Sequence, residues 1–216
     1  YTINPRRKHW NARREIEDFA RRAFRRPVTK DETERFVAVA RAELDRGSSY
    51  IDAVRKAISA ILTSPQFLVL RESPGPLDDY ALAARLSYFL WRTMPDDELL
   101  RLADEGELSS SDALREQTER LLNDPLSYAF VQSFVDQWFD LGSIDATSPD
   151  QHLYPEFDEL LKLSMLAETR GFFRELLDDD LSVRNFIASD FTILNRRLAE
   201  HYGFGGLRGQ HMQRVD

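Results

Sequence analysis

Apolar residues recur at helical spacing along almost the whole chain, and a proline or glycine follows each run. In the first run, Ile16, Phe19 and Ala23 are three and four residues apart, which places them on one face of a helix. Pro27 ends this helix, because proline has no backbone N–H and clashes with the preceding turn. No segment alternates between apolar and polar residues for long enough to form a core strand. The sequence therefore predicts an all-α fold, an irregular array of about 8–9 helices with no significant sheet.

The predicted helices have recognisable ends. Thr29 and Glu32 have the spacing of a capping box, and Gly203 follows the last helix, where glycine is the favoured C-terminal residue. Two prolines and a glycine fall within residues 73–79, which is typical of a linker. The sequence therefore predicts two domains, a small three-helix module over residues 1–74 and a larger helical module over residues 75–216.

Composition excludes several classes of protein. Hydrophobic residues make up 42% and charged residues 31% of the chain, which is the balance of a globular protein rather than a disordered one. The sequence has no cysteine, so it forms no disulfide, no thiolate metal site and no covalent haem attachment of its own. No apolar run approaches the ~18 residues of a membrane span, so no transmembrane segment is predicted. The start of the chain lacks both an initiator Met and an apolar signal core, so we expect an excerpt or a processed product without a signal peptide.

The charge of the chain is unevenly distributed. The net charge is −8, yet residues 1–30 contain ten Lys or Arg and only three Asp or Glu. An acidic body disfavours nucleic acid, so no nucleic-acid partner is predicted. The arginine pairs of the first helix are interpreted as a polar face that meets water or carboxylates of the same chain.

Motifs that carry chemistry are missing from the sequence. The four histidines have no HExxH or i+4 spacing, and the sequence lacks a GxSxG nucleophile elbow and a phosphate-binding P-loop. We therefore assign no catalytic, metal-binding or cofactor-binding residue. His201 and His152 are the two side chains to consider if a haem or metal binds noncovalently. The acidic clusters at residues 96–98 and 178–180 lack calcium-loop spacing and are interpreted as helix-terminal or solvated groups.

Large aromatic residues lie on helical stripes, and burying each of them would remove a large apolar area from water. They are interpreted as core, with binding of a flat hydrophobic ligand as the alternative. The residues expected to be mostly buried are Phe89, Leu90, Phe130, Phe134, Trp138, Leu161, Met165 and Phe172.

Several segments are similar in order to a known family. The chain resembles a short helical module of unknown function at FARRAFRRPVT and AISAILTSPQFL. It resembles a second module of unknown function at LDDYALAARLSYFLWRTMPDDELL, QWFDL, LYPEFDELL and DFTILNRRLAEHYG. These tandem helical domains occur in large planctomycete multidomain proteins that resemble c-type cytochromes, and in some other bacteria.

The resemblance implies a setting for the chain. Parent proteins of this family typically carry c-type cytochrome domains beside these modules, which implies haem c in neighbouring domains and none in this chain. Attachment of c-type haem takes place outside the cytoplasm, which implies a periplasmic or cell-surface location. The family has no catalytic residues to carry over to this sequence.

Three hypotheses follow. The leading one is a non-catalytic helical scaffold that binds adjacent domains of the same polypeptide or a protein partner. The second is part of an oxidoreductase or a polymer-degrading enzyme whose site needs the missing domains. The third is a noncovalent haem or metal binder that uses His152 or His201.

Overall fold

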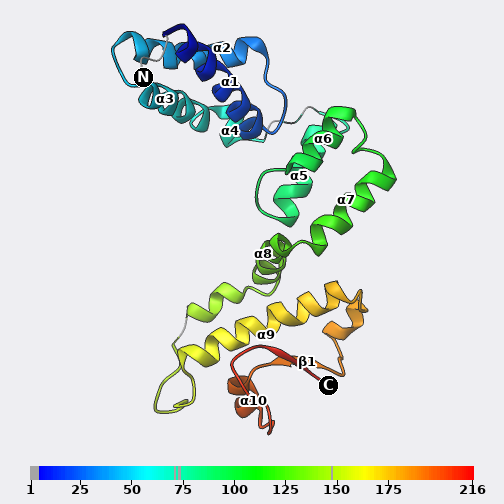
Figure 1. The fold of residues 1–216 in the computed structure, drawn as a ribbon. Helices are drawn as coiled ribbons and strands as arrows, with labels where there is room; N and C mark the ends of the chain where they lie inside the picture. The colour runs from blue at the N-terminus through cyan, green and yellow to red at the C-terminus, as the bar shows by residue number, and fades with distance from the viewer. Residues whose placement is uncertain (1–4, 71, 73, 147) are drawn as a thin grey trace. The chain divides into compact units, whose positions relative to one another are not determined.

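A computed structural model of the 216-residue chain describes the backbone of residues 5–70, 72, 74–146 and 148–216, and the side chains from Ala12 onward within those ranges. The chain divides into two compact units, one ending at Leu121 and one running from Leu122 to Asp216, and each is described by itself. Figure 1 labels the elements.

The all-α prediction is confirmed for the part of the chain that the structure describes. It contains ten α-helices, nine of them with seven residues or more, and two strands of three residues each. None of the helices in the described ranges is long and apolar enough to cross a membrane. The helices of the first unit are α1 (Pro5–Phe24), α2 (Lys30–Asp45), α3 (Tyr50–Leu62), α4 (Pro65–Leu68), α5 (Asp79–Leu90), α6 (Asp97–Glu105) and α7 (Ser111–Asn123), the last of which continues two residues into the second unit.

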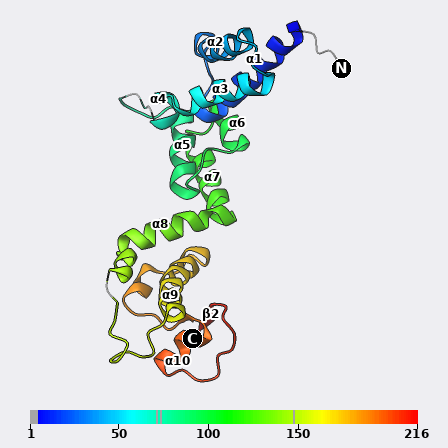
Figure 2. The ribbon, with the colours of Figure 1, turned by 90° about the vertical axis from the view of Figure 1, so that its left-hand side faces the viewer.

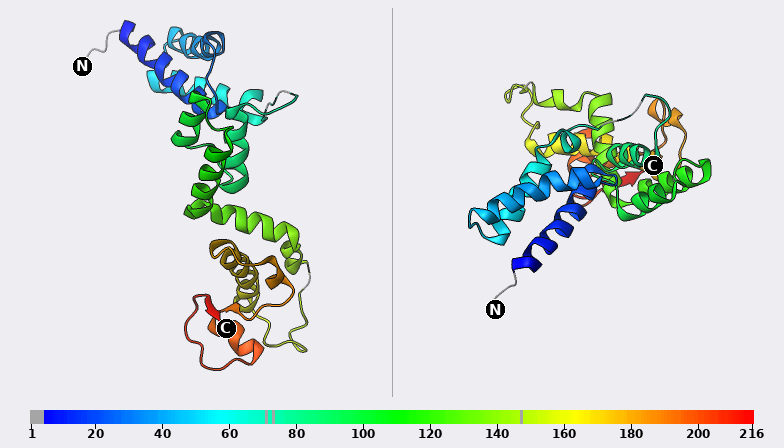
Figure 3. Two further views of the ribbon diagram at one scale, coloured as in Figure 1. Left: turned by 90° about the vertical axis from the view of Figure 1, so that its right-hand side faces the viewer. Right: turned by 90° about the horizontal axis from the view of Figure 1, so that it is seen from above.

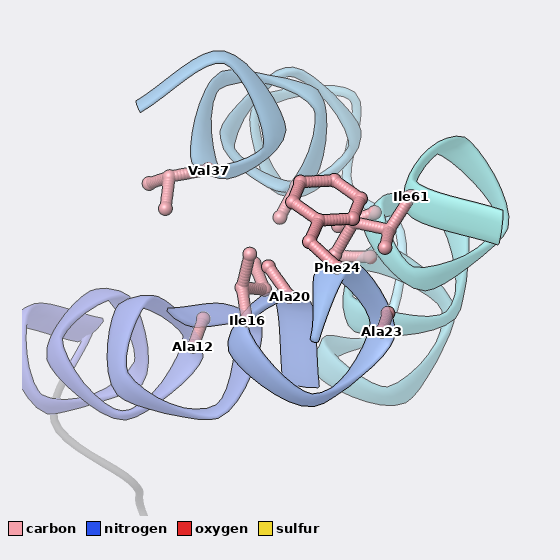
Figure 4. Close-up of a cluster of buried hydrophobic side chains, with 10 residues drawn as sticks. Ala12, Ile16, Ala20, Ala23, Phe24, Val37 and Ile61 are labelled. Atoms are coloured by element: carbon pink, nitrogen blue, oxygen red, sulfur yellow. The ribbon is translucent and has the colours of Figure 1, made fainter. Parts of the chain in front are cut away.

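Helices α1, α2 and α3 pack around a small apolar core. Thr29 starts α2 with the predicted capping box: its hydroxyl accepts from the Glu32 N–H, and the Glu32 carboxylate accepts from the Thr29 N–H. Helix α1 contributes Ile16 and several alanines, which allow the neighbouring helices to approach closely. In Figure 4 the labelled side chains of α1 point towards Val37 of α2 and Ile61 of α3.

Helices α5 and α6 lie side by side in the same unit (Figures 1 and 2). Asp96 caps α6 by accepting from the Leu99 N–H, and its carboxylate also accepts from the Arg120 guanidinium of α7 at 2.7 and 3.1 Å. The indole of Trp91 donates to the Leu121 carbonyl at 2.9 Å, which satisfies a polar group that would otherwise be buried alone. The acidic cluster at residues 96–98 is therefore helix-terminal, as predicted.

Arginines at the end of α1 connect this helix to the rest of the first unit. Arg21 pairs with Asp104 of α6, and Arg26 pairs with Glu32. Arg25 differs from the prediction of a polar face, because it is only 5% exposed. Its guanidinium donates to the Phe67 carbonyl at 2.6 Å and lies over the rings of Phe67 and Tyr88. Arg25 follows the last helical residue with φ of 60°, and this turn aims the side chain inward instead of along the exposed face.

The second unit is built around the long helix α9. Its N-cap is Asp158, three residues after Pro155, and its side chain accepts a hydrogen bond from the Leu161 N–H. The small sheet was not predicted: β1 pairs antiparallel with β2, the red strand beside the C-terminus in Figure 3, and Ile193 lies opposite Arg214. Gly171 lets α9 approach β1, since a Cβ at this position would lie 3.0 Å from Ile193 Cγ2. The elements are η1 (Pro125–Ser127), α8 (Tyr128–Trp138), η2 (Leu141–Asp145), α9 (Glu159–Asp178), η3 (Val183–Phe186), β1 (Thr192–Leu194), α10 (Arg196–Tyr202) and β2 (Gln213–Val215), where η marks a 3₁₀ turn.

The prediction of core residues is partly wrong. Leu90 and Leu161 are buried as expected. Three aromatic residues that were expected in the core are exposed: Phe89 by 61%, Phe134 by 38% and Trp138 by 54%. A helical stripe fixes which residues share a face, but whether a second element covers that face depends on tertiary packing. The remaining three residues, Phe130, Met165 and Phe172, are half-buried.

The predicted linker connects α4 to α5. Pro74, Gly75 and Pro76 form bends there, whereas Ser73 lies outside the described residues. The compact units divide later, after Leu121, because contacts such as those of Arg25 join α1 and α4 to α5. The division into domains at residues 74 and 75 stays a prediction.

Candidate functional site

His152 is not among the residues that line the hollow beside His201. His201 is exposed on the last turn of α10 and lines an open, apolar hollow of about 310 Å³ with Tyr154, Phe157 and Met165. His152 is exposed in the loop before α9, where its backbone N–H donates to the Asp150 carboxylate. Within the described ranges, no group of three or more His, Cys, Asp or Glu side chains is placed to hold a metal ion.

Tyr202, the residue after His201, forms a hydrogen bond that holds α10 against α9. The Tyr202 hydroxyl donates to Glu168 Oε2 at 2.8 Å, and the Thr192 hydroxyl donates to Glu168 Oε1 at 2.9 Å. Burial, followed by the hydrogen bond to the Glu168 carboxylate, raises the pKa of Tyr202 to about 12. These contacts join α10 and β1 to α9. Gly203 ends α10 in the left-handed conformation, as predicted.

The aromatic side chains around α8 form a continuous cluster. Phe134 and Trp138 lie one turn apart with ring centroids 5.4 Å from each other, and Phe139 stacks on Trp138 at 4.8 Å. Phe186 of η3 meets the edge of Trp138 at 5.2 Å, and Phe173 of α9 lies 5.3 Å from Phe134. Such pairs stabilise beyond the area they bury, by ~0.5–1.5 kcal/mol each.

The outer side of this cluster is open to solvent. We define the aromatic surface as Phe134, Trp138, Phe139 and Phe186. Phe134 is 38%, Trp138 54% and Phe139 44% exposed, and Ile187, next to Phe186, is 92% exposed. Contiguous apolar exposure of this kind marks interaction sites more often than single exposed residues do. Tryptophan and other aromatic residues are also enriched where protein interfaces hold most of their binding energy.

The orientation of α8 explains why these rings are exposed. Val131 and Val135 are fully buried and therefore define the inner face of the helix. Phe134 and Trp138 lie on the adjacent row of the same helix, at the edge of its buried face. Asp136 fixes this rotation, because both of its carboxylate oxygens accept from Arg170 of α9, at 2.7 and 2.8 Å. A two-point arginine contact restrains orientation as well as distance.

The sequence contained a signal for this surface that our core assignment did not use. The segment YAFVQSFVDQWFDL places large apolar residues on two adjacent helical rows, one with the valines and one with Phe130, Phe134 and Trp138. One neighbouring element covers about one such row of a helix. Because the apolar face of this helix is wider than one row, the sequence indicated either a deeply buried helix or an exposed interaction face.

Two family models match the chain in tandem. The first, PSD5, described as "Protein of unknown function (DUF1595)", matches residues 11–72. The second, PSD4, described as "Protein of unknown function (DUF1592)", matches residues 77–204, which is more than half of the chain. The tandem arrangement of two modules of unknown function, expected from the resemblance, is thereby confirmed. Neither a curated protein nor a solved structure matches the chain.

Proposed function

We propose that this chain, which belongs to the PSD4 family of proteins of unknown function (DUF1592), is a non-catalytic helical scaffold that binds an adjacent domain of the same polypeptide through its aromatic surface. The observation that carries the proposal is the exposure of Phe134, Trp138 and Phe139 in a cluster whose inner side is firmly packed. Rigid exposed rings bind with little loss of conformational entropy, since they have few rotatable bonds and these are already restrained.

The setting that we propose comes from the family resemblance. The parent would be an exported multidomain protein, periplasmic or at the cell surface, whose neighbouring domains carry haem c. This chain does not fit haem c itself, because covalent attachment needs cysteines and the sequence has none. The scaffold would then hold the haem-carrying domains, and we propose neither nucleic acid nor an enzymatic reaction for the chain alone.

Trp138 is a built-in reporter for this function. In the 216-residue chain we expect Trp138 to emit at long wavelength and to be readily quenched by acrylamide, because its indole is 54% exposed. In a longer polypeptide that includes the neighbouring domains, we expect blue-shifted emission and weaker quenching. Trp91 is buried, and a Trp138→Phe variant of each protein isolates the Trp138 signal by difference. Equal quenching of Trp138 in both proteins would contradict docking at this surface.

Noncovalent haem or metal binding at His201 is the second candidate. It is supported by the apolar hollow in which this imidazole lies with Met165 and Tyr154. A scaffold needs no such cofactor, so we expect haemin titration of the purified chain to give no stoichiometric Soret shift, and metal analysis to give no bound ion. A stoichiometric Soret shift that disappears in His201→Ala but persists in His152→Ala would replace the scaffold with a cofactor-binding function.

A further inference from the structure

We infer that the segment that binds the aromatic surface is basic as well as apolar, with arginine side chains that lie over the exposed rings. This inference rests on the proposed docking function and adds the chemistry of the partner.

The unit that carries the aromatic surface is negatively charged. Residues 122–216 contain 16 Asp or Glu and 8 Lys or Arg, whereas residues 1–121 contain 21 of each. The whole net charge of −8 therefore belongs to the second unit. A negative field of this kind attracts a cationic partner and repels acidic peptides and anionic lipid surfaces.

Exposed carboxylates lie close in sequence to the residues of the aromatic surface. Asp140 directly follows Phe139, and Asp180 and Asp190 lie at the two ends of the segment that contains Phe186. All three are exposed, and among the described residues none of them has an ion-pair partner. Asp136 and Asp178 are already neutralised by Arg170 and Arg174. Arg184 is the single unpaired basic residue of this segment in the described ranges, so negative charge remains in excess.

The ring network already binds one arginine in this way. The guanidinium of Arg214 lies over the ring of Phe191, 4.0 Å from its centroid. Phe191 stacks on Phe172 at 5.1 Å, and Phe172 meets the edge of Phe186 at 5.9 Å. The exposed rings of Trp138 and Phe139 offer the same electron-rich faces, and tryptophan is the strongest of the aromatic cation binders.

The test uses two synthetic amphipathic peptides without tryptophan, both with leucine on one face and with either arginine or glutamate on the other. The 216-residue chain is titrated with each, and Trp138 emission is followed against the Trp138→Phe variant. We expect the arginine peptide alone to blue-shift Trp138, with an affinity that falls about tenfold or more when salt rises from low concentration to ~1 M.

Matched charge variants locate the effect. We expect the affinity for the arginine peptide to fall about tenfold in a triple variant with Asp140→Asn, Asp180→Asn and Asp190→Asn. This is the usual combined size of three exposed charge contacts. The control variant Asp112→Asn, Glu116→Gln and Glu119→Gln removes the same net charge from exposed positions on α7 and should change the affinity less than about twofold. Circular dichroism verifies that both variants fold.

Three results would overturn the inference. Equal binding of the two peptides would show that charge does not select the partner. Absence of binding by the arginine peptide would also overturn the inference. If Trp138 is nevertheless protected from acrylamide in the longer polypeptide, the proposed docking function still holds. A blue shift of Trp138 with phosphatidylcholine vesicles, but not with the peptide, would assign the surface to lipid.

Discussion

Replacing Arg25 with Met is expected to lower the free energy of unfolding of the first unit by about 3 kcal/mol. This is the combined size of one charge-assisted hydrogen bond and the buried cation–π contacts of the guanidinium. Arg25 is 5% exposed and donates to the Phe67 carbonyl at 2.6 Å, so Met would leave this acceptor without its partner. Urea unfolding followed by far-UV circular dichroism measures the change. Arg22→Met, at an exposed position on α1, should stay within about 0.5 kcal/mol of the parent chain.

The backbone at Arg25 allows a sharper version of the experiment. With φ of 60°, this residue has a conformation that costs a residue with a Cβ about 1–2 kcal/mol and costs glycine almost nothing. Arg25→Gly should therefore be about 1 kcal/mol more stable than Arg25→Ala, although both lose the same guanidinium contacts. If Met, Ala and Gly at this position all unfold like the parent chain, Arg25 does not hold α1 against α4 and α5.

Ile16→Ala is the second change with a large expected effect, a loss of about 2–5 kcal/mol. Ile16 is fully buried between α1 and its neighbours, so the substitution removes apolar contacts and leaves a cavity that helices cannot fully close (Figure 4). Urea unfolding of the same unit measures the loss.

Ile51→Ala provides the matched control, because it makes the same chemical change at a position on α3 that is 67% exposed. We expect this variant to stay within about 0.5 kcal/mol of the parent chain. Similar losses from Ile16→Ala and Ile51→Ala would mean that the core between α1, α2 and α3 is wrongly assigned.

The helix ends could be predicted because their causes are local. Thr29 and Glu32 are three residues apart, and one turn of backbone is enough to bring the hydroxyl and the carboxylate to the exposed N–H groups. Gly203 adopts φ of 79°, which only glycine adopts without strain, and this requirement is visible from the residue type. The all-α class followed from the same local patterns, repeated along the chain.

The small sheet could not be predicted for the opposite reason. Thr192 pairs with Val215, and each strand has only three residues, too few to show an alternating pattern. The pairing depends on α10 and the following loop returning the chain to β1, which is a property of the tertiary fold.

Sequence by itself determined the helical class, the tandem modules and the position of each aromatic residue on its helical row. Only the tertiary structure decided which rows are covered: Val131 and Val135 face inward while Trp138 remains exposed. It also decided that Arg25 is buried although its neighbour Arg22 meets water. The physical reason is that periodicity fixes the relative directions of side chains along one helix, whereas burial depends on elements distant in sequence that pack against it.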